Sequence, residues 1–318
     1  MTAASTRIRL SRPADVLGMV PYLVGFHPDE SIVALLLKSG TVVLTMRVNM
    51  PPPEEATKLA ADIAALCDQH GADALVIIGY SVHAEPSREL LMALANQLHS
   101  YALKDLLYTD GHRWWSLMCT ATCCPADGEP YDPSSSSVAA EAVYAGLGVR
   151  ADRRALESEV SGPPDEDRDG LHRLAQQESV TLHRSNLPAR CALMRTLVES
   201  GLASADPVDD STCARMAVLA TDVRVRDVAW SMISWEQGEH HLRLWARVVS
   251  RITAPFEAAP LCLMGFCAWV CGHGAMMNCC IERVLEIDPT YSMGQLLDKI
   301  SRAALPPTVW DEFVVKCP

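Results

Sequence analysis

The spacing of apolar residues in this chain changes about halfway along its length. Before residue 160, short β-rich runs alternate with helical stretches, and after it every apolar segment repeats with helical spacing. A period of two residues fits a strand, and a period of 3.6 fits a helix. The change predicts an α/β N-terminal domain over residues 1–160, with a mixed sheet and flanking helices, followed by an all-α C-terminal domain over residues 161–318.

The N-terminal half predicts five strands and four helices. The strands are expected over residues 32–37, 41–48, 74–79, 103–109 and 114–119. The helices are expected over residues 10–24, from residue 54, from residue 86 and over residues 138–147. The run ALVIIG is apolar throughout, which is typical of a strand covered on both faces. The residues between 123 and 137 are expected to form a loop because they are rich in Pro, Gly, Asp and Ser.

The C-terminal half begins with SGPPDEDRD (residues 161–169), which predicts an acidic linker. Helical periodicity follows to residue 301, and HGAMMNCCIERVLEIDPTY resembles the second helix of a tetratricopeptide unit. The 34-residue period of such repeats does not recur elsewhere. We therefore expect a tetratricopeptide-like helical pair that binds a protein partner or a second copy of the chain.

Charge and hydropathy restrict the partners and the location of the protein. The formal net charge is −12, so no basic surface for nucleic-acid phosphates is expected and direct nucleic-acid binding is not predicted. No run of about 18 apolar residues predicts a membrane span, and the first residues lack a signal-peptide pattern. A cytoplasmic protein without membrane contact is expected. Its 12 cysteines should then be thiols, metal ligands or redox groups rather than structural disulfides.

The run RWWSLMCTATCCP is the densest group of reactive residues in the chain. Together with the preceding His112, its Cys119, Cys123 and Cys124 are candidate ligands for zinc or an iron–sulfur cluster. A four-thiolate cluster would need a further cysteine from a distant segment. Two other interpretations stay open: a thiol switch, such as a disulfide between Cys119 and Cys124, and packing alone.

A second group of cysteines lies near the C-terminus, interleaved with large apolar residues. These are expected to be small buried hydrophobic side chains: Cys262, Cys267, Cys271, Cys279 and Cys280. The pair Cys271-x-His273 is too short a motif to predict a ligand pair.

Polar residues follow several predicted strands and form a second candidate site. If the strands are parallel, these residues meet at one edge of the sheet, where ligands bind in open α/β sheets. An arginine there suits a phosphate or carboxylate, and a histidine suits acid–base chemistry. Alternatively, the arginines form ion pairs and the histidine caps a helix. The candidate ligand-binding residues are Arg47, Asn49, His83, Asp110 and Arg113.

Several segments together resemble one known family. VPYLVGFHPDESIV, MRVNMP, DGHRWWSLMCTATCCPADGEP and GHGAMMNCCIERVLEIDPTYSMGQLLDKI are similar to the family called domain of unknown function 4192, from actinobacteria and their phages. The chain has Asn49-Met50-Pro51 where that family usually has Asp-Leu-Pro, so position 49 lacks a carboxylate. No activity is assigned to the family, so the resemblance implies an architecture and not a reaction.

The motifs of common enzymes are missing from the sequence. It contains no G-x-S-x-G, no phosphate-binding Gly-rich loop and no H-E-x-x-H. The leading hypothesis is an interaction or regulatory protein with a small-ligand or metal-stabilised α/β domain and a helical partner-binding domain. One alternative is a hydrolase or transferase acting on an anionic or phosphorylated small molecule. The other is a zinc or iron–sulfur redox sensor.

Overall fold

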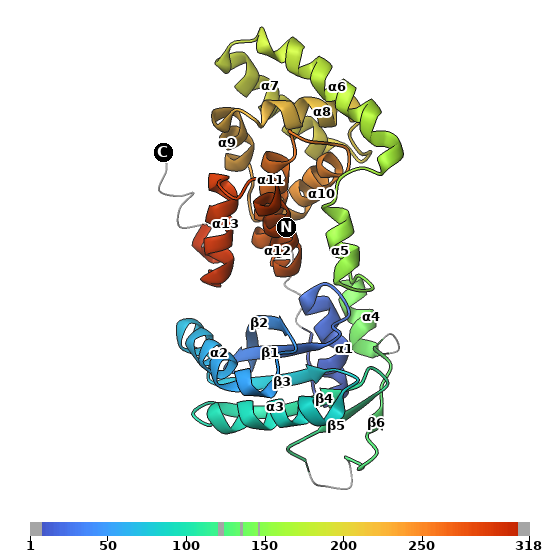
Figure 1. Ribbon diagram of the computed structural model, residues 1–318, viewed down its shortest axis with the longest axis vertical. Helices are drawn as coiled ribbons and strands as arrows, with labels where there is room; N and C mark the ends of the chain where they lie inside the picture. The colour runs from blue at the N-terminus through green and yellow to red at the C-terminus, as the bar shows by residue number, and fades with distance from the viewer. Residues whose placement is uncertain (1–7, 120–123, 134–135, 146, 311–318) are drawn as a thin grey trace. The chain divides into compact units, whose positions relative to one another are not determined.

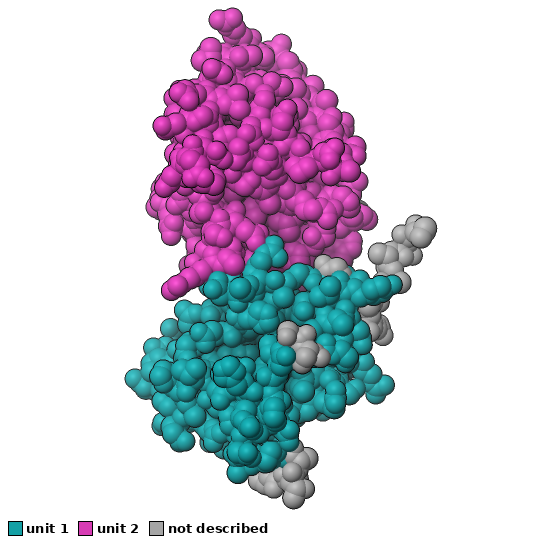
Figure 2. Space-filling view, turned by 90° about the vertical axis from the view of Figure 1, so that its right-hand side faces the viewer, with its two compact units in different colours: residues 1–153 teal, residues 154–318 magenta. Residues whose placement is uncertain are grey.

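A computed structural model describes residues 8–119, 124–133, 136–145 and 147–310. The chain divides into two compact units, Met1–Arg153 and Arg154–Pro318, called here the α/β unit and the helical unit (Figure 2). The expected domain boundary at residue 160 stays a prediction. The predicted order of a mixed sheet with flanking helices followed by a helical region is confirmed.

The α/β unit contains a six-stranded sheet in the order β2-β1-β3-β4-β5-β6. Strands β3 and β4 are parallel, and the other neighbours are antiparallel, which makes the sheet mixed. The strands are β1 (Ser31–Lys38), β2 (Thr41–Asn49), β3 (Ala74–Tyr80), β4 (Ala102–Thr109), β5 (Arg113–Ser116) and β6 (Glu129–Pro130).

The first two strands form a tight hairpin for a local reason. Lys38 pairs with Thr41, so the loop consists of Ser39 and Gly40 alone. Both residues have positive φ, 50° and 78°, as a primed two-residue turn requires. Its twist matches the right-handed twist of the flanking strands, which fixes the register of β1 against β2.

Two helices cover one face of the sheet, and two others pack together in the same unit (Figure 1). Leucine and isoleucine side chains of α2 and α3 share one buried cluster with alternate residues of β1, β3 and β4. Met19 of α1 packs with Val138 and Ala142 of α4. The helices of the unit are α1 (Pro13–Val24), the short 3-10 helix η1 (Pro53–Glu55), α2 (Ala56–His70), α3 (Ala84–Gln97) and α4 (Ser137–Tyr144).

The predicted strand over residues 114–119 is wrong in its extent, because β5 ends at Ser116. The ladder of β4 with β3 is irregular beside Leu75 and Val76, where Lys104 is skipped in the register. Such a bulge bends the strand locally, and regular pairing with β3 continues on both sides of it. Asp105 then accepts a hydrogen bond from the Ser116 hydroxyl at 2.7 Å, at the point where β5 stops. The two-residue strand β6 lies in the segment expected to be loop.

The helical unit contains only helices in its described part. They are α5 (Arg153–Glu159), α6 (Asp165–His183), α7 (Leu187–Ala203), α8 (Asp210–Leu219), α9 (Val223–Ser231), α10 (Gly238–Val249), α11 (Ala258–Val270), α12 (Gly274–Ile287) and α13 (Ser292–Arg302). None of the described helices is long and apolar enough to cross a bilayer. The tetratricopeptide-like character of α11 and α12 stays a prediction.

The acidic linker predicted over residues 161–169 is wrong for its second half, because α6 begins at Asp165. Pro164 lies at the N-cap, and Asp165, Glu166 and Asp167 occupy the first turn. Negative charge there is favoured by the partial positive charge of a helix N-terminus. The acidic run is therefore the start of a helix, and the short helix α5 before it was not predicted.

Helix α11 is the centre of the helical unit. All of its residues from Ala259 to Val270 are buried, as expected of a helix that is apolar all round. Aromatic rings close one end of this core: Phe266 lies 5.5 Å from Trp230 and 4.8 Å from Trp310 between ring centroids. Cys262, Cys267, Cys279 and Cys280 are buried in this unit, as expected of small hydrophobic side chains. The same expectation is wrong for Cys271, which is only half-buried because it lies at the C-cap of α11.

Candidate functional site

One end of each of five strands lies along the same border of the sheet, which is called its edge below. Ser31 at the start of β1 is opposite both Asn49 of β2 and Tyr80 of β3, while Thr109 is opposite both Tyr80 and Trp114. The mixed sheet therefore brings the predicted ligand-binding residues to the same edge, although only β3 and β4 are parallel. Neighbouring strands are about 4.8 Å apart, so residues of β2 lie about 14 Å from those of β4 along this edge.

Arg47 and Asn49 form one group at this edge. Arg47 Nη1 donates to Asn49 Oδ1 at 2.7 Å, and its Nε donates to the Ser31 hydroxyl at 2.9 Å. The guanidinium carbon lies 5.4 Å from the centre of the Phe26 ring. Burial, followed by the nearby charge of Arg153, lowers the pKa of Arg47. Arg47 is thus hydrogen-bonded to both Asn49 and Ser31, and these bonds hold its guanidinium at the end of β2.

Asp110 and Arg113 form a second group that shapes the turn before β5. Asp110 Oδ1 accepts hydrogen bonds from the backbone N–H groups of His112 at 2.8 Å and Arg113 at 2.7 Å, as in an Asx-turn. Arg113 Nη1 donates to the carbonyl oxygens of Gly128 at 2.7 Å and Asp127 at 3.2 Å. Arg113 therefore holds the loop before β6, and a ligand role for it stays a prediction.

His83 is exposed at the N-cap of α3, and its side chain makes no capping hydrogen bond. Its backbone N–H donates to the Ser81 hydroxyl at 3.0 Å. That hydroxyl donates to the two carboxylate oxygens of Glu30 at 2.9 and 3.0 Å. Glu30, which has a φ of +39°, lies in the polar turn just before β1. No periodic pattern of apolar residues marks that turn, so sequence reasoning missed this link between β1 and β3.

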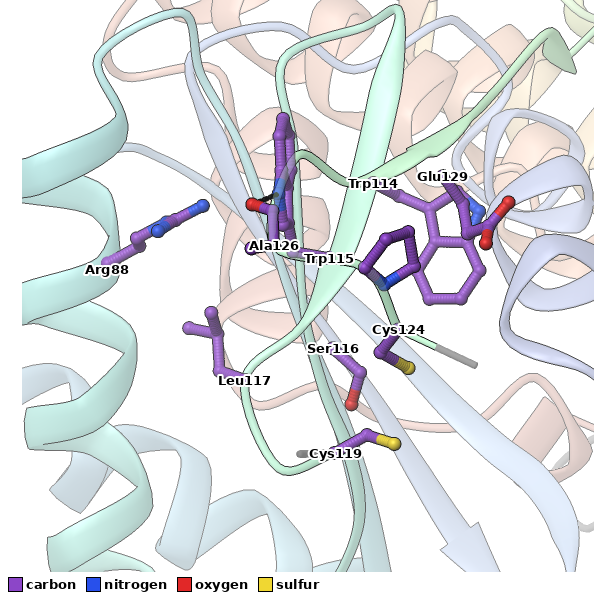
Figure 3. Close-up of a pocket in the computed structure, with 10 residues that line it drawn as sticks. Arg88, Trp114, Trp115, Ser116, Leu117, Cys119, Cys124, Ala126 and Glu129 are labelled. Atoms are coloured by element: carbon purple, nitrogen blue, oxygen red, sulfur yellow. Dashed lines mark hydrogen bonds between the residues drawn. The ribbon is translucent and has the colours of Figure 1, made fainter. Parts of the chain in front are cut away.

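A cavity of about 260 Å³ lies beside β5, close to the tryptophan pair (Figure 3). It brings together residues of α3, of β5 and of the segments on either side of residues 120–123. Its lining residues are Arg88, Trp114, Trp115, Ser116, Leu117, Cys119, Cys124, Pro125, Ala126 and Glu129.

Two residues of the cavity wall, Arg88 and Trp115, pack together with the ring of Tyr108 behind them. Tyr108 and Trp115 are register partners on β4 and β5, so their rings meet on one face, with centroids 5.2 Å apart. The guanidinium of Arg88, from α3, lies 5.3 Å from the centre of each ring. Its Nε is buried without a hydrogen-bond acceptor. No carboxylate among the described residues forms an ion pair with Arg88.

The loop that follows the cysteines is held against Trp115. Trp115 Nε1 donates to the Ala126 carbonyl oxygen at 3.1 Å. Gly128 has a φ of +75°, and a Cβ built on it would lie 2.4 Å from the indole ring. Glycine is thus needed here both for the backbone conformation and for the close approach of the loop to the ring.

The four predicted metal ligands are placed differently from one another. Cys119 and Cys124 both line the cavity, on the opposite side of β5 from Arg88 in Figure 3. His112 is exposed and precedes β5, whereas Cys119 follows it. Cys123 lies outside the described residues. The metal and disulfide interpretations of this run stay predictions.

Cys67 is the nearest earlier cysteine in the sequence, and it is fully buried in the core beneath the sheet. Burial, assisted by the charge of Asp68, raises the pKa of Cys67 to about 11. Arg88 and Glu129 line the cavity but were missed by sequence reasoning. An isolated charged residue belongs to no motif that would mark it in the sequence.

The fold and this cavity define a protein of two parts, an α/β unit that carries a small aromatic-walled pocket and an all-helical unit. The chain belongs to the family described as Domain of unknown function (DUF4192), whose model matches residues 13–308. This match confirms the family resemblance of the sequence segments and extends over both units. No curated protein and no solved structure matches the chain.

Proposed function

We propose that the protein is an interaction or regulatory protein whose α/β unit binds a small anionic molecule at Arg88 and whose helical unit binds a protein partner. We place this role in the cytoplasm, where reducing conditions keep buried thiols such as that of Cys267 unoxidised. The hydrolase or transferase hypothesis and the redox-sensor hypothesis stay predictions.

The observation that carries the ligand proposal is the guanidinium of Arg88 on its aromatic wall. A guanidinium binds carboxylate or phosphate oxygens through two parallel hydrogen bonds, and the rings of Tyr108 and Trp115 hold its plane. The buried Nε of Arg88 has no hydrogen-bond acceptor, and none of the described carboxylates forms an ion pair with this guanidinium, so its charge is available to an anion. The cavity volume of about 260 Å³ lies just below the usual range of small-molecule sites, so only a small anion is expected to fit.

The test is a binding measurement on the full chain with inorganic phosphate, small carboxylates and sugar phosphates. We expect at least one of these anions to raise the melting temperature and to change the fluorescence of Trp115. Arg88→Gln should abolish both responses. Arg173→Gln, which removes the same charge from an exposed position on α6, should leave both unchanged. Equal binding by the Arg88→Gln variant, or no response to any of these anions, would contradict the proposal.

The partner proposal is supported by Trp235, which is 61% exposed after the end of α9. Large aromatic side chains of this kind are the usual anchors of protein interfaces. Light scattering on the purified full chain distinguishes a second copy from another partner. If copies of the chain pair through this side chain, the wild type should be a dimer and Trp235→Ala a monomer. A dimer that survives Trp235→Ala would exclude Trp235 as the anchor of that contact.

A further inference from the structure

Three side chains with metal-ligand chemistry meet where α10, α11 and α12 come together. Glu239 is the second residue of α10, Cys271 is the C-cap of α11, and His273 is the N-cap of α12. One donor atom from each lies within 4.8 Å of the other two. The carboxylate of Glu239 lies 2.7 Å from His273 Nε2. No other such group occurs among the described residues. We call these residues the helix-joint triad.

The turn between α11 and α12 explains why Cys271 and His273 converge. The Gly272 N–H donates to the Trp269 carbonyl at 2.9 Å, and the His273 N–H donates to the Ala268 carbonyl at 2.7 Å. These two bonds form a Schellman motif, in which the residue after the C-cap adopts a left-handed conformation. Gly272 has a φ of +79°, as the motif requires. The turn is therefore fixed by backbone bonds.

Space for the sulfur atom comes from Gly238, the first residue of α10. A Cβ built on Gly238 would lie 2.8 Å from Cys271 Sγ and 3.4 Å from a methyl carbon of Val270. The φ of Gly238 is not in the left-handed range, so close approach, and not backbone conformation, is what a larger residue would disturb here. This contact brings the sulfur against the N-terminus of α10, one residue before Glu239.

We propose that Glu239, Cys271 and His273 bind one divalent metal ion of the zinc type. Thiolate, imidazole and carboxylate are the donors that zinc prefers in proteins. Metal–ligand bonds of about 2.0–2.3 Å in a tetrahedron place donors about 3.3–3.8 Å apart, which the three atoms reach with small side-chain movements. The carboxylate and the thiolate together balance the charge of the ion.

The triad is partly open to solvent, with 56% of the Glu239 side chain and 36% of the His273 side chain exposed. Water can therefore occupy a fourth position, as in zinc sites with three protein ligands. A bound ion would link the start of α10 to the α11–α12 turn. The proposed zinc site shares no residue with the Arg88 pocket of the α/β unit.

The experiment uses the full chain, stripped with a chelator under reducing conditions and then loaded with zinc alone. After desalting, elemental analysis should find one zinc per chain in the wild type. Cys271→Ser and His273→Asn should weaken zinc binding by about 100-fold or more, since even residues that only support ligands change affinity by 10–100-fold. Replacement of zinc by cobalt should show sulfur-to-cobalt charge transfer that Cys271→Ser removes.

The matched control is the double variant Cys119→Ser/Cys124→Ser, which should bind zinc like the wild type. Because Cys271 is partly buried, circular dichroism must show that each variant is folded. His273→Asn changes a half-buried side chain and Glu239→Gln an exposed one, so both keep the test valid if Cys271→Ser does not fold. Retention of zinc in folded His273→Asn and Glu239→Gln would overturn the proposal. So would a wild type that binds no zinc.

Discussion

Cys119 and Cys124, here called the strand-end cysteines, and the helix-joint triad place sulfur in very different surroundings. The strand-end cysteines lie near two tryptophans at a cavity wall, on either side of residues outside the described part of the chain. In the triad, Cys271 meets a carboxylate and an imidazole from two other helices. Among the described residues, the cysteine-rich run brings two sulfur atoms to a cavity wall, whereas the single Cys271 lies beside two other potential ligands.

The difference follows from the backbone around each group. An extended strand separates His112 from Cys119, because residues along β5 advance by about 3.3 Å each. A Schellman motif instead folds Cys271 and His273 back beside the same helix end. Each site also depends on one glycine that makes room for its central side chain, Gly128 for Trp115 and Gly238 for Cys271.

The largest effect is expected from Gly128→Ala. The new Cβ would lie 2.4 Å from the Trp115 ring, and the residue would have to keep a φ of +75°. Overpacking and a left-handed non-glycine residue each cost about 1–3 kcal/mol, so we expect a loss of about 3 kcal/mol in the free energy of unfolding. Urea denaturation measures it. Gly111→Ala, with a φ of +90° and open space, should cost only about 1 kcal/mol. Equal losses for the two variants would contradict the close contact.

At the helix joint, Gly238→Ala should cost about 1–2 kcal/mol, because its Cβ would collide with Cys271 Sγ at 2.8 Å without a backbone penalty. Gly170→Ala, in α6 with nothing within 4 Å, should be neutral or stabilising. The double variant Gly238→Ala/Cys271→Ala removes the collision. Denaturation should show that the double variant is more stable than Gly238→Ala. The double variant should still bind no zinc, because it lacks Cys271. A double variant no more stable than Gly238→Ala would show that sulfur is not the obstacle.

An ion pair elsewhere in the helical unit shows how much a paired carboxylate contributes to stability when no metal site is proposed beside it. Glu178 accepts two hydrogen bonds from Arg215, at 2.8 and 2.9 Å, and this interaction lowers the pKa of Glu178. Because the folded pKa is lower than the unfolded one, the pair stabilises the fold above the unfolded pKa of about 4.3 and loses its effect as pH falls through the folded pKa.

Glu178→Gln should therefore lower the free energy of unfolding by about 1 kcal/mol at pH 7, a small value because the Arg215 side chain is 35% exposed. At a pH below the folded pKa of Glu178, the variant and the wild type should be equally stable. Denaturation at both pH values measures this difference. A loss that persists unchanged in acid would mean that packing, and not charge, explains the effect of Glu178.

The smallest effect is expected at the strand end. Cys119 and Cys124 are half-buried, and substitutions away from the core usually change stability by no more than about 0.5 kcal/mol. Cys124→Ser should therefore leave the denaturation midpoint and the zinc content of the chain almost unchanged. A loss of several kcal/mol, or of bound zinc, would move the metal site to the strand end and reverse the comparison of the two groups.

Much of the fold could be predicted from the sequence, since apolar periodicity located the hairpin, the buried strand β3 and helices such as α10 and α11. The end of β5 at Ser116 could not, because the apolar residues Leu117 and Met118 continue the run and only the pairing with β4 shows where the strand ends. The start of α6 in an acidic, proline-containing run was misread as a linker, although acidic residues also favour a helix N-terminus.

The sites were less predictable than the fold. Arg47 and Asn49 are joined by a hydrogen bond, and Cys119 and Cys124 share a cavity, while the ligand roles of all four stay predictions. Arg88 and Glu239 carried no signal, because each becomes significant only through contacts between elements far apart in the chain. Arg88 needs the register pair of Tyr108 and Trp115, and Glu239 needs the turn after α11.

The most direct measurement is zinc-edge X-ray absorption on the zinc-loaded full chain, which counts sulfur atoms around the ion. A site made by Glu239, Cys271 and His273 should show one sulfur at about 2.3 Å and otherwise nitrogen or oxygen ligands at about 2.0–2.2 Å. That spectrum should be identical in Cys119→Ser/Cys124→Ser. Two or more sulfur ligands in the wild type would contradict the assignment, and their loss in Cys119→Ser/Cys124→Ser would place the ion at the strand-end cysteines.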